Sequence, residues 1–151
     1  MGNWTGQILK ATTSTSVGVG SLENPSSTTR RLLLMEFIVG SDAATLGTSN
    51  FRWELNRSTT TATGTSITPQ ALDLSDTSTS ALIKSNLSAN GTLTSGAIME
   101  TLAIAEQVTF RWVAPPGSPI IIPAVANNGI HWMTPVCGNT PSAAVQITYA
   151  D

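Results

Sequence analysis

Alternation of hydrophobic and polar residues is the dominant pattern of this chain. In residues 51–57 (FRWELNR) every second residue is apolar, which is the period of a strand with one buried face. Residues 108–113 and 145–149 show the same period. The pattern predicts three strands, whose inward sets are Phe51, Trp53 and Leu55; Val108, Phe110 and Trp112; and Val145, Ile147 and Tyr149.

A nearly continuous apolar run, residues 31–39 (RLLLMEFIV), predicts an element that is covered on both faces. Periodicity alone does not separate a buried strand from a short helix in such a run. The turn-forming residues Gly40-Ser41-Asp42 follow directly and favour a strand. Leu33, Met35, Phe37 and Val39 would then share one face of this strand.

Shorter segments between turn signals complete the pattern. Residues 120–122 are expected to form a short strand, because prolines stand on both sides of it. Residues 81–87 and 98–104 are strand candidates on either side of Asn90-Gly91, a dipeptide that favours a tight hairpin turn. Asn128-Gly129 predicts a second turn.

Roughly eight short strands with turn signals between them are typical of an all-β domain. We predict an antiparallel two-sheet sandwich of jelly-roll-like type, with a small barrel as the other possibility. The first 27 residues differ in composition from the rest of the chain, since Trp4, Ile8 and Leu9 lie in a segment rich in Ser, Thr and Gly that ends at Asn24-Pro25. The expected organisation is an extended N-terminal arm over residues 1–27 and a sandwich domain over residues 28–151.

The chain is poor in charge and rich in hydroxyl groups. Charged residues make up 11% of its 151 positions, against about 25% in an ordinary soluble domain. Thr and Ser together occupy 40 positions, and the formal net charge is −2. Nucleic acids and anionic membranes both require a basic surface, so neither is an expected partner. No apolar run approaches the roughly 18 residues of a membrane span, and no leader for secretion is evident.

Candidate catalytic side chains are few. His131 is the only histidine, and strand alternation places it on the face opposite to Ile130 and Trp132. This favours a solvated or hydrogen-bonded strand histidine over a catalytic one. Cys137 is the only cysteine, which excludes an internal disulfide, and no basic neighbour in sequence would activate it. We therefore expect no enzymatic activity and no cofactor.

The acidic residues do not form a metal-binding or catalytic pattern. Asp73 and Asp76 are separated by two residues, but a calcium loop needs about six to eight oxygen ligands. Turn formation or helix capping is the expected role, and residues 69–76 could form one helical turn. Four glutamates are scattered among the predicted strands, at Glu36, Glu54, Glu100 and Glu106. No metal site is expected.

Two groups of residues leave an alternative open. Arg52, Glu54 and Arg111 are placed for cross-strand ion pairs within one chain or for pairs between subunits. The four tryptophans could stack on a sugar. Two of them fall on predicted core faces, so only Trp4 and Trp132 remain as surface candidates.

Three segments resemble a group of small structural proteins of tailed bacteriophages. They are residues 60–73 (TTATGTSITPQALD), 109–117 (TFRWVAPPG) and 121–130 (IIPAVANNGI). Together they are similar to the patterns TxTGTxxTPxALD, FRWVAxPG and IPAxANxGI of such virion proteins, over residues 30–149. By similarity to jelly-roll cement proteins, the resemblance implies a capsid decoration protein that forms homotrimers. It would be made in the host cytoplasm and located on the virion surface.

A chain with so little charge suits a protein that neighbouring subunits cover. The leading hypothesis is a cement protein bound to the major capsid protein and to copies of itself, with shell contacts through Trp4, Ile8, Leu9, Arg30 and Arg31. One alternative is a tail, baseplate or head-fibre module that binds a host-surface glycan, with Trp132 facing solvent. Another is a hydrolase of unknown type, which would need His131.

Overall fold

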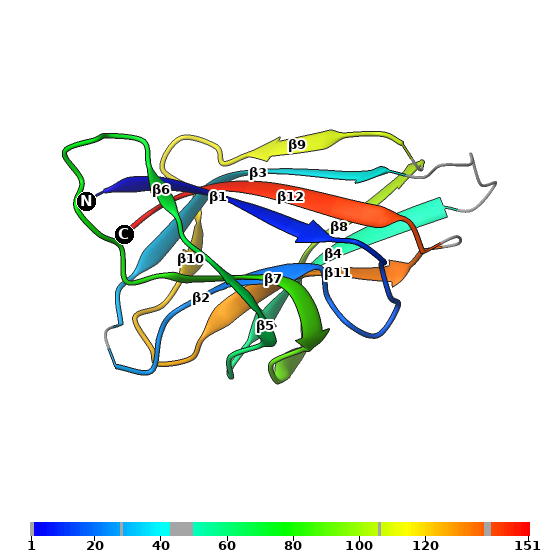
Figure 1. Cartoon of the computed structure of the whole chain (residues 1–151), viewed down its shortest axis with the longest axis horizontal. Coiled ribbons are helices and arrows are strands. Elements are labelled where there is room, and N and C mark those ends of the chain that lie inside the picture. Colours follow the sequence, from blue (N-terminus) through cyan, green and yellow to red (C-terminus); the bar gives the residue numbers. More distant parts are fainter. Residues whose placement is uncertain (1, 28, 43–49, 106, 138–139) are drawn as a thin grey trace.

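The computed structural model describes residues 2–27, 29–42, 50–105, 107–137 and 140–151 (Figure 1). Within these ranges the chain forms two antiparallel sheets of six strands each, packed face to face. The prediction of an all-β two-sheet sandwich is confirmed. The N-terminal and C-terminal ends lie close together at one end of the sandwich (Figure 1), where the Asp151 amide donates to the Gly2 carbonyl at 3.2 Å.

The two sheets draw their strands from the whole length of the chain. Sheet A contains β1 (Asn3–Lys10), β3 (Leu32–Asp42), β6 (Gln70–Ala71), β9 (Phe110–Val113), β10 (Ile120–Ile122) and β12 (Ser142–Ala150). Sheet B contains β2 (Gly20–Glu23), β4 (Asn50–Ser58), β5 (Thr63–Ile67), β7 (Leu82–Ala89), β8 (Leu93–Ala105) and β11 (Gly129–Val136).

Strand pairing is nested from the ends of the chain inward. Strand β1 pairs with β12 and β2 pairs with β11, while β12 also borders β3 and β11 also borders β4. Beyond these, β9 and β10 share one edge of β3, and β8 pairs with β4. This gives the orders β1-β12-β3-β9/β10 and β2-β11-β4-β8, a jelly-roll-like arrangement of two sheets.

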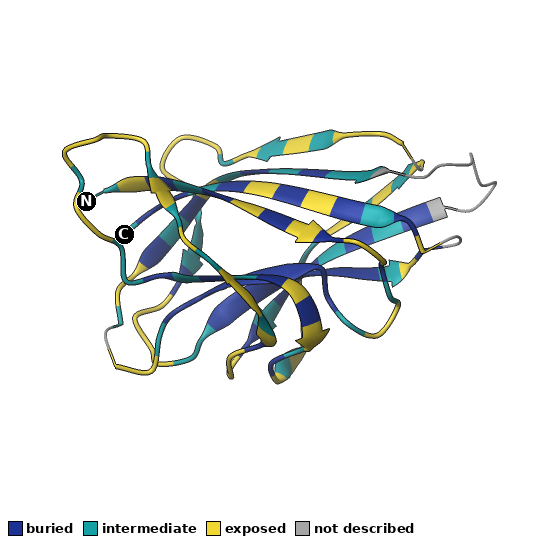
Figure 2. Cartoon of the chain, viewed as in Figure 1, coloured by how far each residue is buried: buried dark blue, intermediate teal, exposed yellow. Residues whose placement is uncertain are grey.

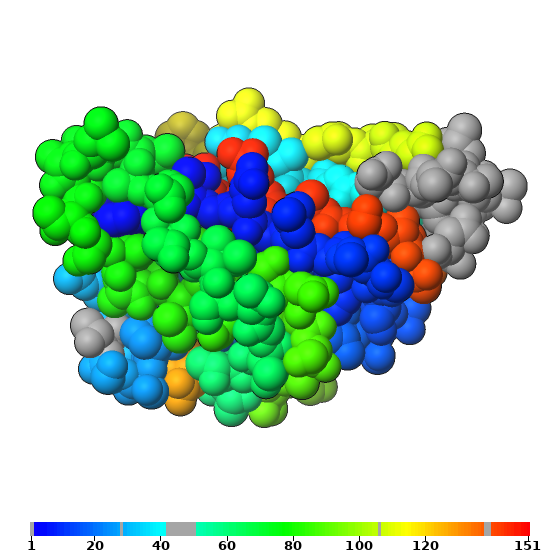
Figure 3. All heavy atoms as spheres, viewed as in Figure 1, coloured from blue at the N-terminus to red at the C-terminus, as the bar shows by residue number. Residues whose placement is uncertain are grey.

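An insertion between β4 and β8 closes one flank of the sandwich. It contributes β6 next to β1 in sheet A, and β7 and β5 next to β2 in sheet B. In Figure 3 this green segment lies directly against the blue N-terminal strand. Its Ile67, Ala71 and Ala81 side chains pack against or within the main core. The insertion therefore joins the two sheets on the side of β1 and β2.

The hairpin predicted at Asn90-Gly91 was wrong. Strand β7 pairs with β2 and β5, while β8 pairs with β4 on the other side of sheet B. The Asn90 side chain instead accepts from the Gly18 amide and donates to the Ser16 carbonyl, both at 2.8 Å. A Cβ at Gly91 would overlap the Thr60 carbonyl oxygen. The dipeptide thus lies where the chain after β7 passes close to residues 16–18 and to Thr60.

The alternating patterns identified the core well. Phe51, Trp53 and Leu55 of β4 are buried, and so are the three inward residues predicted for β12, Val145, Ile147 and Tyr149. In β9, Phe110 and Trp112 pack against the core as partly buried residues. Val108 differs from the prediction, because it precedes the strand and is 44% exposed.

A β-bulge changes the inward face of β3. The predicted strand is present as β3, which begins at Leu32, but Leu32, Leu34, Phe37 and Val39 face the core. The register against β12 shifts at Met35, because Thr148 lies opposite Glu36 while Tyr149 lies opposite Leu34. One extra residue reverses the alternation. The prediction that Leu33 and Met35 share a face with Phe37 and Val39 is therefore wrong.

The extended arm predicted for residues 1–27 is not what the structure shows, because β1 lies inside sheet A and β2 inside sheet B. Trp4 is 4% exposed and Ile8 is fully buried. Gly6 and Lys10 occupy the other inward positions of β1, so glycine and lysine interrupt the apolar period that would have revealed a strand. A glycine fits at position 6 because the Ile83 side chain of β7 occupies the space that a Cβ would need.

Two smaller predictions have clear outcomes. Residues 69–76 contain strand β6 and a turn instead of a helical turn. Asp73 accepts from the amide and hydroxyl of Ser75, at 2.9 and 2.8 Å, and these bonds lower the pKa of its carboxyl. Its expected role in turn formation is confirmed. Cys137 is buried and unpaired.

Candidate interaction surface

The only histidine lies in a buried pair. His131 Nε2 is 3.2 Å from Glu23 Oε1, and both side chains are fully buried. The contact is too bent to be a well-aligned hydrogen bond. Glu23 Oε1 also accepts from the Ala62 amide at 2.9 Å. The pair therefore links β2, β11 and the loop after β4. It offers no exposed group to a substrate.

The described ranges of the chain contain no group of metal ligands and no membrane-spanning helix. Within those ranges, no three His, Cys, Asp or Glu side chains are grouped so that they could hold a metal ion. No described helix is long and apolar enough to span a bilayer. The features that remain are surfaces.

The outer face of sheet A is a broad surface with few charges, which we call the A face. Cross-strand pairing arranges it in rows. Leu9, Ala144 and Gly40 form one row across β1, β12 and β3. The next two rows are Gln7, Gln146 and Ile38, and then Thr5, Thr148 and Glu36. Over its central strands β1 and β12, the A face is therefore made only of small, amide, hydroxyl and apolar side chains.

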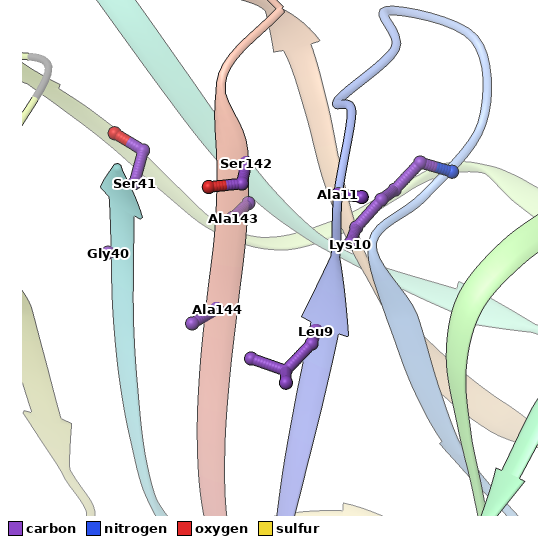
Figure 4. A pocket seen from close by; sticks show the side chains of 8 residues that line it. All are labelled: Leu9, Lys10, Ala11, Gly40, Ser41, Ser142, Ala143 and Ala144. Atoms are coloured by element: carbon purple, nitrogen blue, oxygen red, sulfur yellow. The ribbon is translucent and has the colours of Figure 1, made fainter. Parts of the chain in front are cut away.

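A shallow depression of about 470 Å³ lies at one end of the A face (Figure 4). It forms because Gly40 has no side chain and Ala144 has only a methyl group, while Leu9 rises beside them and is 58% exposed. A second hollow shares these three residues and extends to Ile38 and Thr109. Together they make an apolar groove that crosses three strands, which we call the Leu9 groove.

Lys10 borders the Leu9 groove but does not project into it as a free cation. In Figure 4 its side chain points away from Leu9. The Lys10 ammonium donates to the carbonyls of Gly18 at 3.1 Å and Leu87 at 2.6 Å. Burial lowers the pKa of this amine. The lysine thus fastens the end of β1 to its neighbours, and it leaves the groove uncharged.

Arg111 and Glu36 neutralise each other on the A face. Arg111 Nε of β9 contacts Glu36 Oε1 of β3 at 2.5 Å. This contact lowers the pKa of the Glu36 carboxyl and raises the pKa of Arg111. Arg52 and Glu54 contact each other along β4 at 3.2 Å, on sheet B. Arg111 thus forms a cross-strand pair within one chain, but with Glu36, whereas Arg52 and Glu54 pair along one strand and not across strands as expected.

At the opposite end of the A face lies a second depression of about 480 Å³, which we call the Arg31 pocket. Its lining residues are Asn3, Arg31, Leu33, Met35, Gly117, Pro119, Ile121 and Ala150. Arg31 is exposed and has no carboxylate partner among the described residues. It provides one unpaired positive charge beside an otherwise apolar surface.

The five predicted contact residues separate into two groups. Leu9 and Arg31 line the two depressions, and Arg30 is exposed, with Nη1 3.9 Å from Asp151 Oδ2. Trp4 and Ile8 are core residues and unavailable to a partner. Trp4 Nε1 donates to Asp151 Oδ1 at 3.0 Å, so this tryptophan anchors the C-terminus.

Sequence reasoning missed the small residues of the A face and overestimated one tryptophan. Ala144 and Gly40 shape the Leu9 groove because their side chains are small or absent. In a sequence, an alanine or a glycine does not by itself indicate a binding surface. The alternation Ala144, Gln146, Thr148 on the outer face of β12 was the available sign. Trp132, the expected solvent-facing aromatic, is 1% exposed, so that prediction was wrong.

Comparisons with known proteins add no relative, since no protein-family model, curated protein or solved structure matches this chain.

Proposed function

We propose that this protein is a virion structural protein that decorates and cements the capsid of a tailed bacteriophage. In this proposal the A face lies against neighbouring major capsid subunits, and many weak contacts across it hold them together. Copies of the protein would cover the virion surface after synthesis in the host cytoplasm. The resemblance of residues 30–149 to such proteins suggests the shell as the partner.

The observation that carries the proposal is the lack of charge on a wide, exposed sheet surface. Interface centres are depleted in charged residues, because an unpaired charge that loses its water costs free energy. The Leu9 groove gives such a surface a concave apolar centre, and exposed apolar hollows of this kind mark binding surfaces. The Arg31 pocket adds one cation at the other end, suited to a carboxylate of the partner.

The direct test is co-sedimentation of the purified protein with expanded capsids that lack decoration. We expect saturable binding at a fixed ratio to the major capsid subunit. A folded protein that does not bind would contradict the proposal. Mass measurement of the protein alone, without shells, tests the homotrimer that the resemblance implies.

A matched pair of variants locates the binding surface. Ala144→Lys places a charge in the Leu9 groove at an exposed position, so the fold should be preserved and the apparent Kd for shells should rise at least tenfold. Thr65→Lys introduces the same side chain at an exposed position of β5, on the other sheet, and should bind as the wild type does. Equal binding by both variants would remove the A face from the proposal.

No described residue favours the glycan-binding alternative. Its expected aromatic, Trp132, is buried in the core.

A further inference from the structure

The open edge of strand β8 is a second candidate binding surface of the molecule. Strand β8 spans thirteen residues, Leu93–Ala105, and pairs with β4 only among the described strands. Its other edge therefore presents a row of backbone amide and carbonyl groups that no described strand satisfies. Such an edge is a template for another strand.

The other three sheet edges carry features that discourage pairing. Strand β6 has two residues, and β5 has five residues with an irregular register against β7. At the edge formed by β9 and β10, prolines precede and follow β10. Arg57 Nη1 also donates to the Ile121 carbonyl there at 3.1 Å. Short strands, prolines and capped carbonyls all protect an edge.

Strand β8 lacks these protections over its regular half. It contains no proline, lysine or arginine, and Glu100 is its one charged residue. The register against β4 is irregular before Glu100, and then continuous from Glu100 opposite Leu55 to Ala105 opposite Asn50. Residues 100–105 thus form a regular ladder with one free side.

The core is also incompletely covered beside this edge. Eight hydrophobic residues pack against the core but remain partly exposed. Two of them, Ile67 and Ala71, belong to the insertion, and the other six belong to β8, β9 or β10: Met99, Leu102, Ile104, Phe110, Trp112 and Ile120. Figure 2 shows β9 as an alternation of exposed and intermediate residues, in contrast to the buried centre of each sheet. The insertion closes the opposite flank, whereas this flank has no equivalent cover among the described residues.

We propose that the free edge of β8 pairs with β8 of a second copy of this chain, in antiparallel orientation about a two-fold axis. The pair would join the two B sheets into one continuous sheet and cover the exposed margin of each core. This inference does not depend on the proposed attachment to a shell, but it puts a two-fold dimer in place of the homotrimer that the resemblance implies.

A second copy fits this edge in a register that places no like charges opposite each other. Residues that face each other across an antiparallel pair must lie on the same face of the sheet. A two-fold axis at Leu102 satisfies this, with Leu102 beside its own copy and Thr101 opposite Ala103. Glu100 then faces Ile104, and the two Glu100 side chains are about 13 Å apart along the strand at 3.3 to 3.4 Å per residue.

The outer positions of the pair are small as well as uncharged. Thr101, Ala103 and Ala105 are exposed and lie on the outward face of β8. None of them would obstruct an approaching strand. Neither like charges nor bulky side chains therefore oppose the pairing in this register.

Molar mass of the full chain in solution tests the inference, by sedimentation equilibrium over a range of concentrations. The expected result for the wild type is a concentration-dependent approach to twice the chain mass of 15.7 kDa. A mass that stays at one chain, or that reaches three chains, would overturn the two-fold pairing.

Charge variants test the register itself. Thr101→Lys with Ala103→Lys places lysines directly opposite each other, and should raise the Kd for self-association at least tenfold. Thr63→Lys with Thr65→Lys puts two lysines at the same spacing on the exposed β5 edge of the same sheet, and should associate as the wild type does. An equal loss in both variants, or a dimer that persists in the β8 variant, would refute the assignment.

A mixing experiment guards against the possibility that the β8 lysines merely damage the fold. Thr101→Glu with Ala103→Glu should also be monomeric alone. When this variant is mixed with the lysine variant, each lysine faces a glutamate and the mixture should return to the two-chain mass. Failure of the mixture to associate, with both variants folded by circular dichroism, would overturn the proposed register.

Discussion

Ile8→Ala is the sharpest test of the finding that the N-terminal segment belongs to the core. Ile8 is fully buried, and its Cγ2 lies where a Cβ at Gly20 would stand, so it connects β1 of one sheet to β2 of the other. The substitution removes three carbons, which at about 0.8 kcal/mol each amounts to roughly 2.4 kcal/mol before any cavity contribution. Including that contribution, the expected loss of unfolding free energy is about 2 to 5 kcal/mol.

The adjacent residue supplies the control for this measurement. Leu9 is on the same strand but 58% exposed, so Leu9→Ala should change the unfolding free energy by no more than about 0.5 kcal/mol. Urea unfolding followed by tryptophan fluorescence would give both values. A free arm would make the two variants equal, and that result would refute the placement of β1. Deletion of residues 1–25 should abolish folding for the same reason.

Two further predictions concern buried polar side chains. Glu23→Ala removes the acceptor of the buried Ala62 amide and the contact with His131, and should cost about 1 to 3 kcal/mol in urea unfolding, whereas Glu23→Gln retains an acceptor for the amide and should cost less. Lys10→Met removes a donor from two carbonyls and should destabilise the fold by about 1 to 3 kcal/mol. Because burial lowers the folded-state pKa of Lys10, the unfolded chain binds this proton more tightly. The stability of the wild type relative to Lys10→Met should therefore increase as the pH rises towards about 10.4, and a constant difference between pH 7 and pH 10 would contradict this.

The sequence predicted the fold class and the cores of β4 and β12, because those strands keep an uninterrupted two-residue period. It did not predict the inward face of β3 or the existence of β1. In β3 the bulge at Met35 depends on pairing with β12, a strand more than a hundred residues away. In β1 the inward positions Gly6 and Lys10 are determined by Ile83 and by the carbonyls of Gly18 and Leu87, on other segments of the chain. Both failures come from contacts that no local pattern contains.

The candidate surface was predictable only in part, for a related reason. Leu9 and Arg31 are chemically distinctive, and both lie at the depressions of the A face. The shape of the Leu9 groove comes from Gly40 and Ala144, which meet only because β3 and β12 pair in that register. A hollow formed by small or absent side chains can therefore be recognised only when the strand order is known.

The structure shows which surfaces of the protein lack charged residues. The A face over β1 and β12 and the outward face of β8 are both uncharged, whereas Lys10, Glu23 and Asp151 are held in specific contacts. Two uncharged surfaces on different sheets imply two separable associations. Ala144→Lys should reduce shell binding and leave the molar mass unchanged, while the β8 lysine variant should lower the molar mass without altering the A face. Loss of both properties in either variant would mean that one surface, and not two, accounts for the missing charge.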